Sequence, residues 1–261
     1  MEKYYGNIDV LMNNNSISKH LYELAHIPGA YFFDISVAMY PGVEERFSFY
    51  PVNIFQEYIR KIGINNNDHL ILYSRGSMGG NMFAARCFYL LEMYGFKSMS
   101  LLSGGFNKWM KDGFIEDEGF EDYMGEGDFV GERDFEMTVS YDELTTKNNE
   151  GKDMFDRAGD DVTFIDARPF TDYQKSHIIN AVNLPVIETI NDDGTIKEAN
   201  EILQIAEINN VTFTQPIVVY CNTGTQASLL AFIIENVIGM KVRLYNGGFT
   251  ELKVKDSSRF T

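Results

Sequence analysis

The chain has 261 residues, 44% of them hydrophobic and 14% aromatic, which excludes a disordered chain and favours two domains of ordinary size. Its 38 acidic and 22 basic residues give a formal net charge of -16, and so acidic a surface repels phosphate backbones, so we expect no nucleic-acid partner. No apolar run reaches the length of about eighteen residues that a membrane span needs, so we expect no membrane partner.

Two cysteines provide no disulfide framework, and the N-terminal residues lack the basic-then-apolar pattern of a secretory signal. Both features predict a reducing compartment, which keeps a working thiol reduced. We expect the cytoplasm, with the mitochondrion as the alternative.

One order of motifs occurs twice along the chain. HIPGAYFFDI at 26–35 matches HIINAVNLPV at 177–186, HLILYSRG at 69–76 matches PIVVYCNTG at 216–224, and SLLSGGFNKW at 100–109 matches RLYNGGFTEL at 243–252. The offsets between the first residues are 151, 147 and 143, so the two copies differ only by small loop changes. A duplicated domain explains this pattern, with one domain at 1–113, an acidic linker at 114–137 and a second domain at 138–261.

Short apolar runs alternate with helical patterns in each half. In chain order, the sequence predicts a helix at 55–63, a strand at 69–73, a helix at 82–95, a strand at 98–102, strands at 162–166 and 216–220, a helix at 227–239 and a strand at 241–245. Gly95 and Gly239 are suited to end the two longer helices. We therefore expect an α/β fold of two domains, each a small parallel sheet flanked by helices.

Cys221 directly follows the strand at 216–220, and a short loop leads from it into a helix that begins near Ala227. Loops at the carboxyl ends of parallel strands bind ligands, and helix N-termini offer free N–H groups. We therefore expect backbone donors around Cys221 that favour an anion, a pKa of Cys221 below that of an ordinary cysteine, and a nucleophilic thiol. Gly224 allows the tight turn.

Four motifs in the second half resemble a rhodanese domain: FIDAR at 164–168, HIINAVNLP at 177–185, the Cys221 loop and YNGGF at 245–249. HIPGA at 26–30 and LLSGGFNKW at 101–109 resemble a second rhodanese domain in the first half. The tandem arrangement is most similar to the thiosulfate and 3-mercaptopyruvate sulfurtransferases.

This resemblance implies a sulfurtransferase in which Cys221 is catalytic. Cys221 would take sulfane sulfur from a small-molecule donor as a persulfide and pass it to a thiol such as thioredoxin, or to cyanide. No metal and no organic cofactor is implied. The loop residues that would bind the donor are Asn222, Gly224, Thr225, Gln226 and Ala227.

The resemblance also assigns roles to Thr223, Asp34 and Ser74. Thr223 stands where mercaptopyruvate enzymes carry a serine and thiosulfate enzymes a basic residue, which favours 3-mercaptopyruvate over thiosulfate. Asp34 maps onto an aspartate of the first domain that reaches the site in mercaptopyruvate enzymes. Both residues have a second interpretation, as partners in local loop bonding. Ser74 takes the cysteine position of the first half, so that half should be catalytically silent.

Arg168 has two interpretations. The family carries further arginines near this motif that bind the donor's carboxylate or sulfonate, whereas DARPFTDYQKSHI at 166–178 contains only Arg168. Arg168 could bind the donor, or it could brace the edge of the sheet through an ion pair. The donor therefore stays open at this point.

The remaining candidates have structural interpretations. Cys87 lies in an apolar helix, where a cysteine is a small buried hydrophobe. His26 and His177 occur in both halves, including the silent one, which indicates a structural hydrogen bond and argues against catalysis.

Three alternative functions follow from the same residues. A phosphatase of the dual-specificity type needs an arginine five residues after its cysteine, and the stretch after Cys221 has none. A non-catalytic regulatory or binding module agrees with the missing arginines but not with the retained Cys221 loop. A Cys–His hydrolase would need a histidine beside Cys221.

Overall fold

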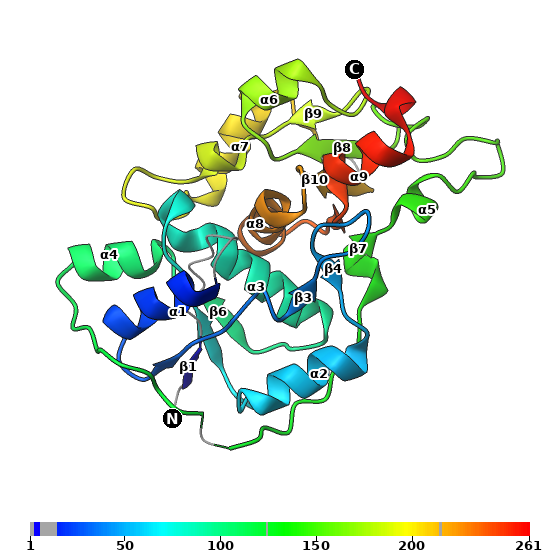
Figure 1. The fold of residues 1–261 in the computed structure, drawn as a ribbon. Coiled ribbons are helices and arrows are strands. Elements are labelled where there is room, and N and C mark those ends of the chain that lie inside the picture. The colour runs from blue at the N-terminus through cyan, green and yellow to red at the C-terminus, as the bar shows by residue number, and fades with distance from the viewer. Residues whose placement is uncertain (1–2, 6–14, 124, 214–215) are drawn as a thin grey trace. The chain divides into compact units, whose positions relative to one another are not determined.

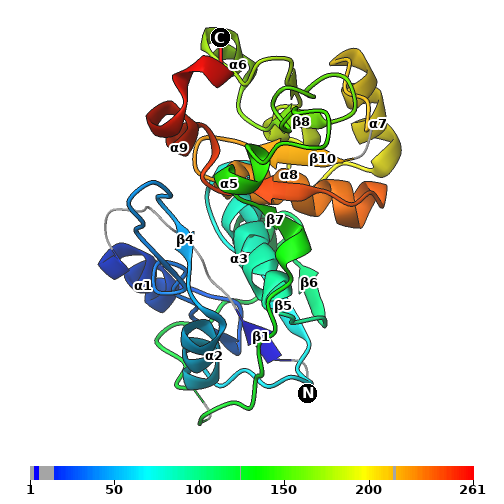
Figure 2. The same cartoon turned by 90° about the vertical axis from the view of Figure 1, so that its right-hand side faces the viewer.

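The computed structural model describes residues 3–5, 15–123, 125–213 and 216–261, drawn as a ribbon in Figures 1 and 2. The chain forms two compact units. The first unit comprises Met1–Tyr40, Phe49–Asp134 and Asp192–Thr195. The second comprises Pro41–Ser48, Phe135–Asn191 and Ile196–Thr261.

The first unit is built on a parallel four-stranded sheet in the order β2-β1-β5-β6. Its strands are β1 (Lys3–Tyr5), β2 (Ala30–Tyr31), β5 (Leu70–Leu72) and β6 (Met99–Leu101). Its helices are α1 (Asn15–Leu24), α2 (Val52–Lys61), α3 (Asn81–Met93) and α4 (Gly105–Lys111), with a 3-10 turn, η1 (Ser77–Gly80), before α3. Two short strands, β3 (Met39–Tyr40) and β4 (Ser48–Phe49), pair with each other. Helix α3 packs against β5 and β6 and buries Cys87 completely, in agreement with its structural interpretation.

The second unit is built on a parallel five-stranded sheet in the order β7-β11-β10-β8-β9. Its strands are β7 (Thr138–Val139), β8 (Thr163–Asp166), β9 (Val182–Asn183), β10 (Ile217–Tyr220) and β11 (Arg243–Tyr245). Its helices are α5 (Tyr141–Leu144), α6 (Phe170–Lys175), α7 (Ala199–Ile208), α8 (Thr225–Ile233) and α9 (Gly248–Lys255). Single turns complete it: η2 (Phe135–Met137), η3 (Val186–Thr189), the π-helical η4 (Ile234–Ile238) and η5 (Ser257–Arg259).

These sheets confirm the predicted α/β class and all five predicted strands. Every residue of β10 is buried, because it is a central strand and α8 packs against it and against β11. The helix predicted at 227–239 begins slightly earlier, at Thr225, and continues through η4 to Gly239. Gly239 is left-handed, with φ of 85°, as the predicted helix stop requires.

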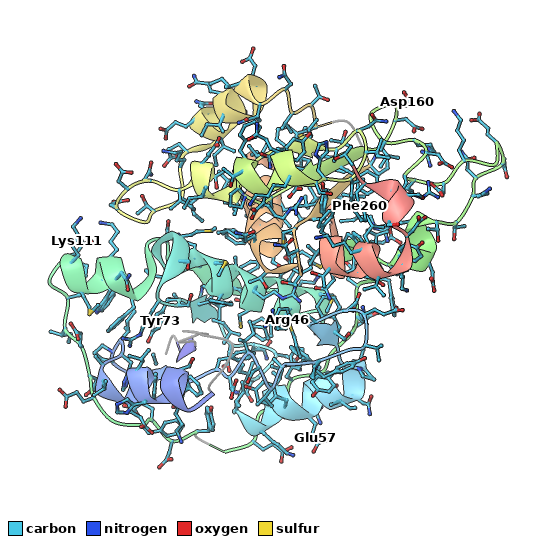
Figure 3. The ribbon with its side chains drawn as sticks, turned by 45° about the horizontal axis from the view of Figure 1, so that its top comes forward. Arg46, Glu57, Tyr73, Lys111, Asp160 and Phe260 are labelled. Atoms are coloured by element: carbon cyan, nitrogen blue, oxygen red, sulfur yellow. The ribbon has the colours of Figure 1, made fainter. Side chains whose placement is uncertain are left out.

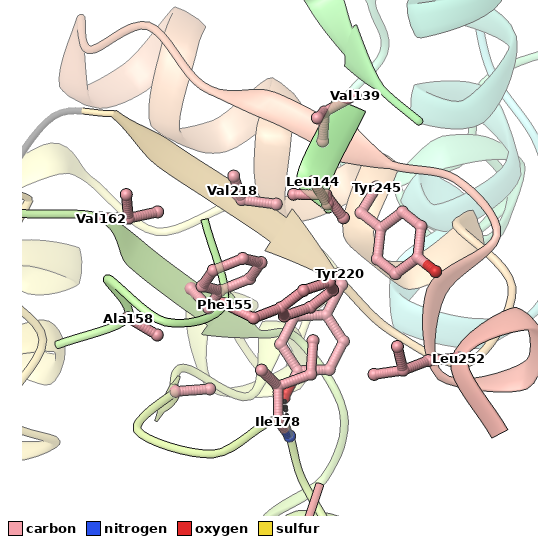
Figure 4. Packing of buried hydrophobic residues seen from close by; sticks show 12 residues of the cluster. Val139, Leu144, Phe155, Ala158, Val162, Ile178, Val218, Tyr220, Tyr245 and Leu252 are labelled. Atoms are coloured by element: carbon pink, nitrogen blue, oxygen red, sulfur yellow. Dashed lines mark hydrogen bonds between the residues drawn. The ribbon is translucent and has the colours of Figure 1, made fainter. Parts of the chain in front are cut away.

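The core of the second unit forms on the face of the sheet that carries Tyr220 and Val218 (Figure 4). The rings of Phe155 and Phe164 stack there with centroids 5.3 Å apart. Figure 4 also shows Ile178 beside the Tyr220 ring, where the hydroxyl of Tyr220 accepts the Ile178 N–H at 3.1 Å. The buried strand β10 thus places the polar tip of Tyr220 where the Ile178 N–H needs a partner.

The same hydrogen bonds occur in both halves at the motif histidines. His26 Nδ1 lies 3.0 Å from the Tyr22 carbonyl oxygen, and His177 Nδ1 lies 2.8 Å from that of Tyr173. Each imidazole also stacks on that tyrosine, with centroids 4.2 Å and 3.9 Å apart. The structural role predicted for both histidines is confirmed.

The C-terminal residues pack beside the second of these histidines. Thr261 N donates to the His177 carbonyl at 3.0 Å. In Figure 3, Phe260 lies beside α9, and its ring meets Phe249 edge to face with centroids 4.9 Å apart. The chain end therefore covers the core next to the His177 motif.

The acidic segment expected to act as a linker packs on the first unit for most of its length. Gly127 N donates to the Arg60 carbonyl at 2.8 Å, and Arg60 Nε donates to the Phe129 carbonyl at 2.6 Å. Phe129 itself is buried. These hydrogen bonds and the buried ring of Phe129 hold the segment on the first unit, which extends to Asp134.

Each unit contains one short segment from the other half of the chain: Asp192–Thr195 belongs to the first unit, and Pro41–Ser48 belongs to the second. In the first unit, Asn81 Nδ2 donates to the Gly194 carbonyl at 2.6 Å. In the second unit, Asn246 Nδ2 donates to the Phe47 carbonyl at 2.8 Å, and Lys255 Nζ lies 2.8 Å from a carboxylate oxygen of Glu44. Neither excursion has a counterpart in the predicted boundaries, which divide the chain at single points.

Within the described residues, no helix is both long and apolar enough to cross a membrane.

The hydroxyl of Tyr220 generates a stability prediction. Tyr220→Phe removes the acceptor of the buried Ile178 N–H and should lower the free energy of unfolding by about 1–3 kcal/mol, because an unpaired buried donor keeps its desolvation cost. Urea unfolding followed by circular dichroism measures the change. Tyr173→Phe is the control: its hydroxyl donates to the Ala181 carbonyl, which tolerates loss of a donor better, so it should cost less. Equal losses in the two variants would contradict this account.

Candidate active site around Cys221

Cys221 lies immediately after β10, at the carboxyl edge of the central strands of the second unit. Only three residues, 222–224, separate it from the start of α8. Its side chain is 2% exposed. The thiol therefore lies at the bottom of a short strand-to-helix loop, as predicted.

Backbone N–H groups surround the Cys221 sulfur. Hydrogen bonds reach it from the backbones of Ala227, Thr223, Gln226 and Gly224. Gly224 makes this possible because it precedes α8 in the left-handed conformation, with φ of 82°. The predicted ring of backbone donors is present, and it can hold a sulfur anion without any charged side chain.

The expected direction of the Cys221 pKa is wrong. Burial raises the pKa of the Cys221 thiol, and the four backbone donors only oppose this rise. The physical reason is that a thiolate loses nearly all its hydration at a site so thoroughly enclosed, and neutral donors return only part of that loss. The sequence could indicate the donors but not how completely the sulfur is buried.

The start of α9 holds the Cys221 loop through two backbone hydrogen bonds. Phe249 N donates to the Cys221 carbonyl at 2.8 Å, and Thr250 N donates to the Asn222 carbonyl at 3.1 Å. Gly248 must be glycine, because a Cβ there would lie 2.4 Å from the Cys221 oxygen. The start of α9 thus fixes the backbone on which the thiol is mounted.

Arg168 forms the buried ion pair that one of its two interpretations predicted. Its Nη2 lies 2.6 Å from Asp166 Oδ2, and both side chains are almost fully buried. Nη2 also donates to the Ser176 carbonyl at 2.7 Å, and Nη1 lies 3.4 Å from Asn222 Oδ1. Its other interpretation, donor binding, stays a prediction.

Sequence reasoning missed Asp166 and Asn183 as parts of this arrangement. The amide of Asn183 donates to the carbonyls of Asp166 and Arg168 at 2.8 Å and 2.9 Å, so β9 fixes the end of β8. An aspartate two residues before an arginine at a strand end was the available signal for the ion pair, because such residues share one face of a strand.

Ser74 occupies in the first unit the place that Cys221 occupies in the second. Phe106 N donates to the Ser74 carbonyl at 3.0 Å, as Phe249 N does to Cys221. The loop that follows is longer, since six residues, 75–80, precede α3, and the Ser74 hydroxyl donates to the Gly80 carbonyl. The predicted correspondence of the two positions is confirmed, although the two loops differ.

The other predicted site residues are distributed over both units. Thr225 and Ala227 are buried in the first turn of α8, and Thr223 and Gln226 are partly buried. Asp34 belongs to the first unit, where its carboxylate accepts the backbone N–H of Ser36 at 2.9 Å. That contact agrees with local loop bonding, and a catalytic role of Asp34 stays a prediction.

Comparisons with known proteins agree with this fold. The family model of the rhodanese-like domain matches residues 8–112 and 147–255. The Caenorhabditis elegans protein mpst-1, assigned by name to the thiosulfate sulfurtransferases, is 32% identical over 96% of this chain and 81% of its own length. The 3-mercaptopyruvate sulfurtransferase of Escherichia coli K12 is 27% identical over 87% of this chain and 79% of its own.

Solved structures give the same result. The crystal structure of SseA from Escherichia coli, described as having the rhodanese fold of 3-mercaptopyruvate sulfotransferases, superposes with a TM-score of 0.78 at 25% identity, over 95% of this chain and 92% of that one. Tum1 of Saccharomyces cerevisiae superposes with a TM-score of 0.82 over 98% and 90%, and at 18% identity it supports the fold alone.

The raised pKa of Cys221 predicts the pH dependence of its reactivity. Alkylation by iodoacetamide, followed on the peptide that contains Cys221, should still be accelerating above about pH 8.5, the ordinary cysteine pKa. A midpoint below that value would show that the backbone donors outweigh burial.

The raised pKa of Cys221 also makes the stability of the fold depend on pH. Because the folded thiol holds its proton more tightly than the unfolded one, its contribution is complete below about pH 8.5 and is lost as the pH rises through the folded pKa. Cys221→Ser should therefore lessen the loss of unfolding free energy at alkaline pH, as urea titrations at pH 7 and above pH 9 would measure.

Proposed function

We propose that this chain, which belongs to the rhodanese family, is a sulfurtransferase that moves sulfane sulfur through a persulfide on Cys221. The observation that carries the proposal is the enclosure of this one thiol by four backbone N–H groups at the carboxyl edge of a parallel sheet. A persulfide needs a cysteine to carry it and donors to hold its outer sulfur. The names of the relatives, thiosulfate and 3-mercaptopyruvate sulfurtransferases, support the same chemistry.

The first half-reaction loads Cys221. With 3-mercaptopyruvate, the Cys221 sulfur forms a bond to the donor's sulfur, and the bond between that sulfur and the donor's carbon breaks. The electron pair leaves on the enolate of pyruvate, which takes up the proton lost from the Cys221 thiol. Cysteine and mercaptopyruvate thus give cysteine persulfide and pyruvate, with atoms and charge balanced.

Within the sulfurtransferases we propose 3-mercaptopyruvate over thiosulfate as the donor. Burial raises the pKa of Cys221, so the resting thiol carries a proton. An enolate leaving group needs that proton, whereas sulfite leaves from thiosulfate without one. Thr223, in the loop beside the sulfur, offers a hydroxyl where a dianionic donor would gain more from a cation.

The second half-reaction unloads the persulfide. The sulfur of an acceptor thiol, in the manner of thioredoxin, forms a bond to the outer sulfur, and the bond between that sulfur and the Cys221 sulfur breaks. The acceptor becomes a persulfide, and Cys221 is a thiol again after it takes up the acceptor's proton. Cyanide does the same and carries the sulfur away as thiocyanate. The four backbone donors that hold the persulfide anion also stabilise the Cys221 sulfur as it becomes the leaving group.

A matched pair of cysteine variants tests the persulfide. Cys221→Ser should abolish thiocyanate formation with either donor, because a hydroxyl cannot carry sulfane sulfur. Cys87→Ser, in the core of α3, should keep turnover if the protein stays folded. Colorimetric cyanolysis measures both. Substantial turnover by the Cys221 variant would refute the proposal, and an intact wild-type protein that never releases thiocyanate would favour a binding module.

Donor preference has its own test. We expect a kcat/KM for 3-mercaptopyruvate above that for thiosulfate, and Thr223→Lys should shift the ratio toward thiosulfate because a fixed cation attracts the dianion more strongly. Steady-state kinetics with both donors and cyanide as the acceptor gives the ratio. A wild-type preference for thiosulfate would refute the choice of donor without affecting the persulfide.

A further inference from the structure

The side-chain amide of Asn222 has a chemically fixed orientation. Arg168 Nη1 lies 3.4 Å from Asn222 Oδ1. A guanidinium has only donors, so the amide oxygen and not the amide nitrogen must face it. The two N–H groups of the Asn222 amide therefore point away from Arg168.

Arg168 cannot turn to accommodate another orientation. Its Nε lies 2.9 Å and its Nη2 2.6 Å from the two carboxylate oxygens of Asp166, an arrangement that grips the guanidinium from one side. Its plane lies over the ring of Phe249, with 4.4 Å between Cζ and the ring centroid. The Arg168 residue is only 3% exposed. The direction of its free edge toward Asn222 is thus built into the core.

Asn222 itself is exposed, although it directly follows the buried Cys221. Its backbone carbonyl is bound by Thr250 N, and its side-chain oxygen by Arg168. Among the hydrogen bonds between described residues, none involves Asn222 Nδ2. A pair of amide donors is therefore presented to solvent one residue from the thiol.

We propose that Asn222 recognises the carboxylate of the sulfur donor through its amide N–H groups, and that Arg168 is the positioning residue that orients this amide. The inference rests on the proposed function and deepens it. A neutral amide can bind one carboxylate by hydrogen bonds but adds no charge. The charge of Arg168 is already matched by Asp166, so the pair adds little net attraction for a dianion. The donor class that fits is a small monocarboxylate.

The opposing explanation is that Asn222 only braces the loop through Arg168. Asn222→Asp separates the two, because an aspartate strengthens the contact with Arg168 while it replaces the amide donors with a second anionic oxygen. If Asn222 only stabilises the loop, the KM of Asn222→Asp for the donor should be no higher than that of the wild type. If Asn222 recognises the carboxylate, the KM of Asn222→Asp for the donor should be higher than that of Asn222→Ala.

Steady-state kinetics with 3-mercaptopyruvate should show this order. Asn222→Ala should raise KM by about tenfold, the value of a hydrogen bond to a charged group, with kcat changed little. Asn222→Asp should raise KM further. An Asn222→Asp variant with a KM at or below the wild-type value would overturn the proposal.

Alkylation supplies a readout that does not depend on turnover. Iodoacetate and iodoacetamide differ in one carboxylate, so the ratio of their rates at Cys221 measures recognition of that group. The ratio should fall about threefold to tenfold in Asn222→Asp, with Asn222→Ala between it and wild type. Measurement in the Cys87→Ser background excludes the other thiol. If wild type makes no thiocyanate, the proposed function fails, while this ratio still decides the role of Asn222; an unchanged ratio rejects that role.

Arg168→Lys tests the positioning. Lysine keeps the charge but loses the planar fork, so the amide of Asn222 is released. Arg168→Lys should raise KM as much as Asn222→Ala does, at similar kcat. The double variant, Arg168→Lys with Asn222→Ala, should raise KM no further than either single variant. A double variant whose KM increase is the product of the single ones would reject the positioning role. Circular dichroism checks folding, and if the buried substitution prevents it, the exposed Asn222 variants decide the recognition proposal alone.

Discussion

A single backbone hydrogen bond, from Phe249 N to the Cys221 carbonyl, sets the conditions for everything else in the site. It requires the start of α9 to approach the end of β10 so closely that Gly248 has no room for a Cβ. The Cys221 carbonyl is held from this side, the following residues lead into α8, and the N–H groups of this loop and of the first turn of α8 act on the sulfur. The first unit keeps the same contact between Phe106 and Ser74 but follows it with a longer loop. Closeness of backbone, more than any side chain, therefore defines this site.

Features that follow from local pattern could be predicted from the sequence. Short apolar runs indicated the strands, the repeated motifs indicated two similar units, and recurrence in both halves identified His26 and His177 as structural. The equivalence of Ser74 and Cys221 also followed from the repeat, and the structure bears it out: Phe106 N donates to the Ser74 carbonyl as Phe249 N does to the Cys221 carbonyl.

Features that depend on the depth of burial or on distant contacts could not be predicted. The donors around Cys221 were foreseeable from the loop, but the direction of its pKa depends on how much water reaches the sulfur, which no spacing encodes. Likewise, Arg168 and Asn222 are 54 residues apart, and nothing local indicates that the guanidinium of one fixes the amide of the other. The placement of the acidic segment depends on hydrogen bonds to distant residues and on the buried ring of Phe129, and its charged composition indicates neither.

The two segments that each unit takes from the other half, Pro41–Ser48 and Asp192–Thr195, mean that neither half of the chain is a complete unit by itself. A fragment beginning at Phe135 would hold Cys221 and its loop but would lack Pro41–Ser48, and with it the carbonyl bound by Asn246 and the carboxylate bound by Lys255. A fragment ending at Asp134 would lack Gly194, the partner of Asn81. The duplication left two copies of one architecture, yet each copy now completes its surface with residues encoded in the other. Loss of either half of the chain would therefore remove part of both units.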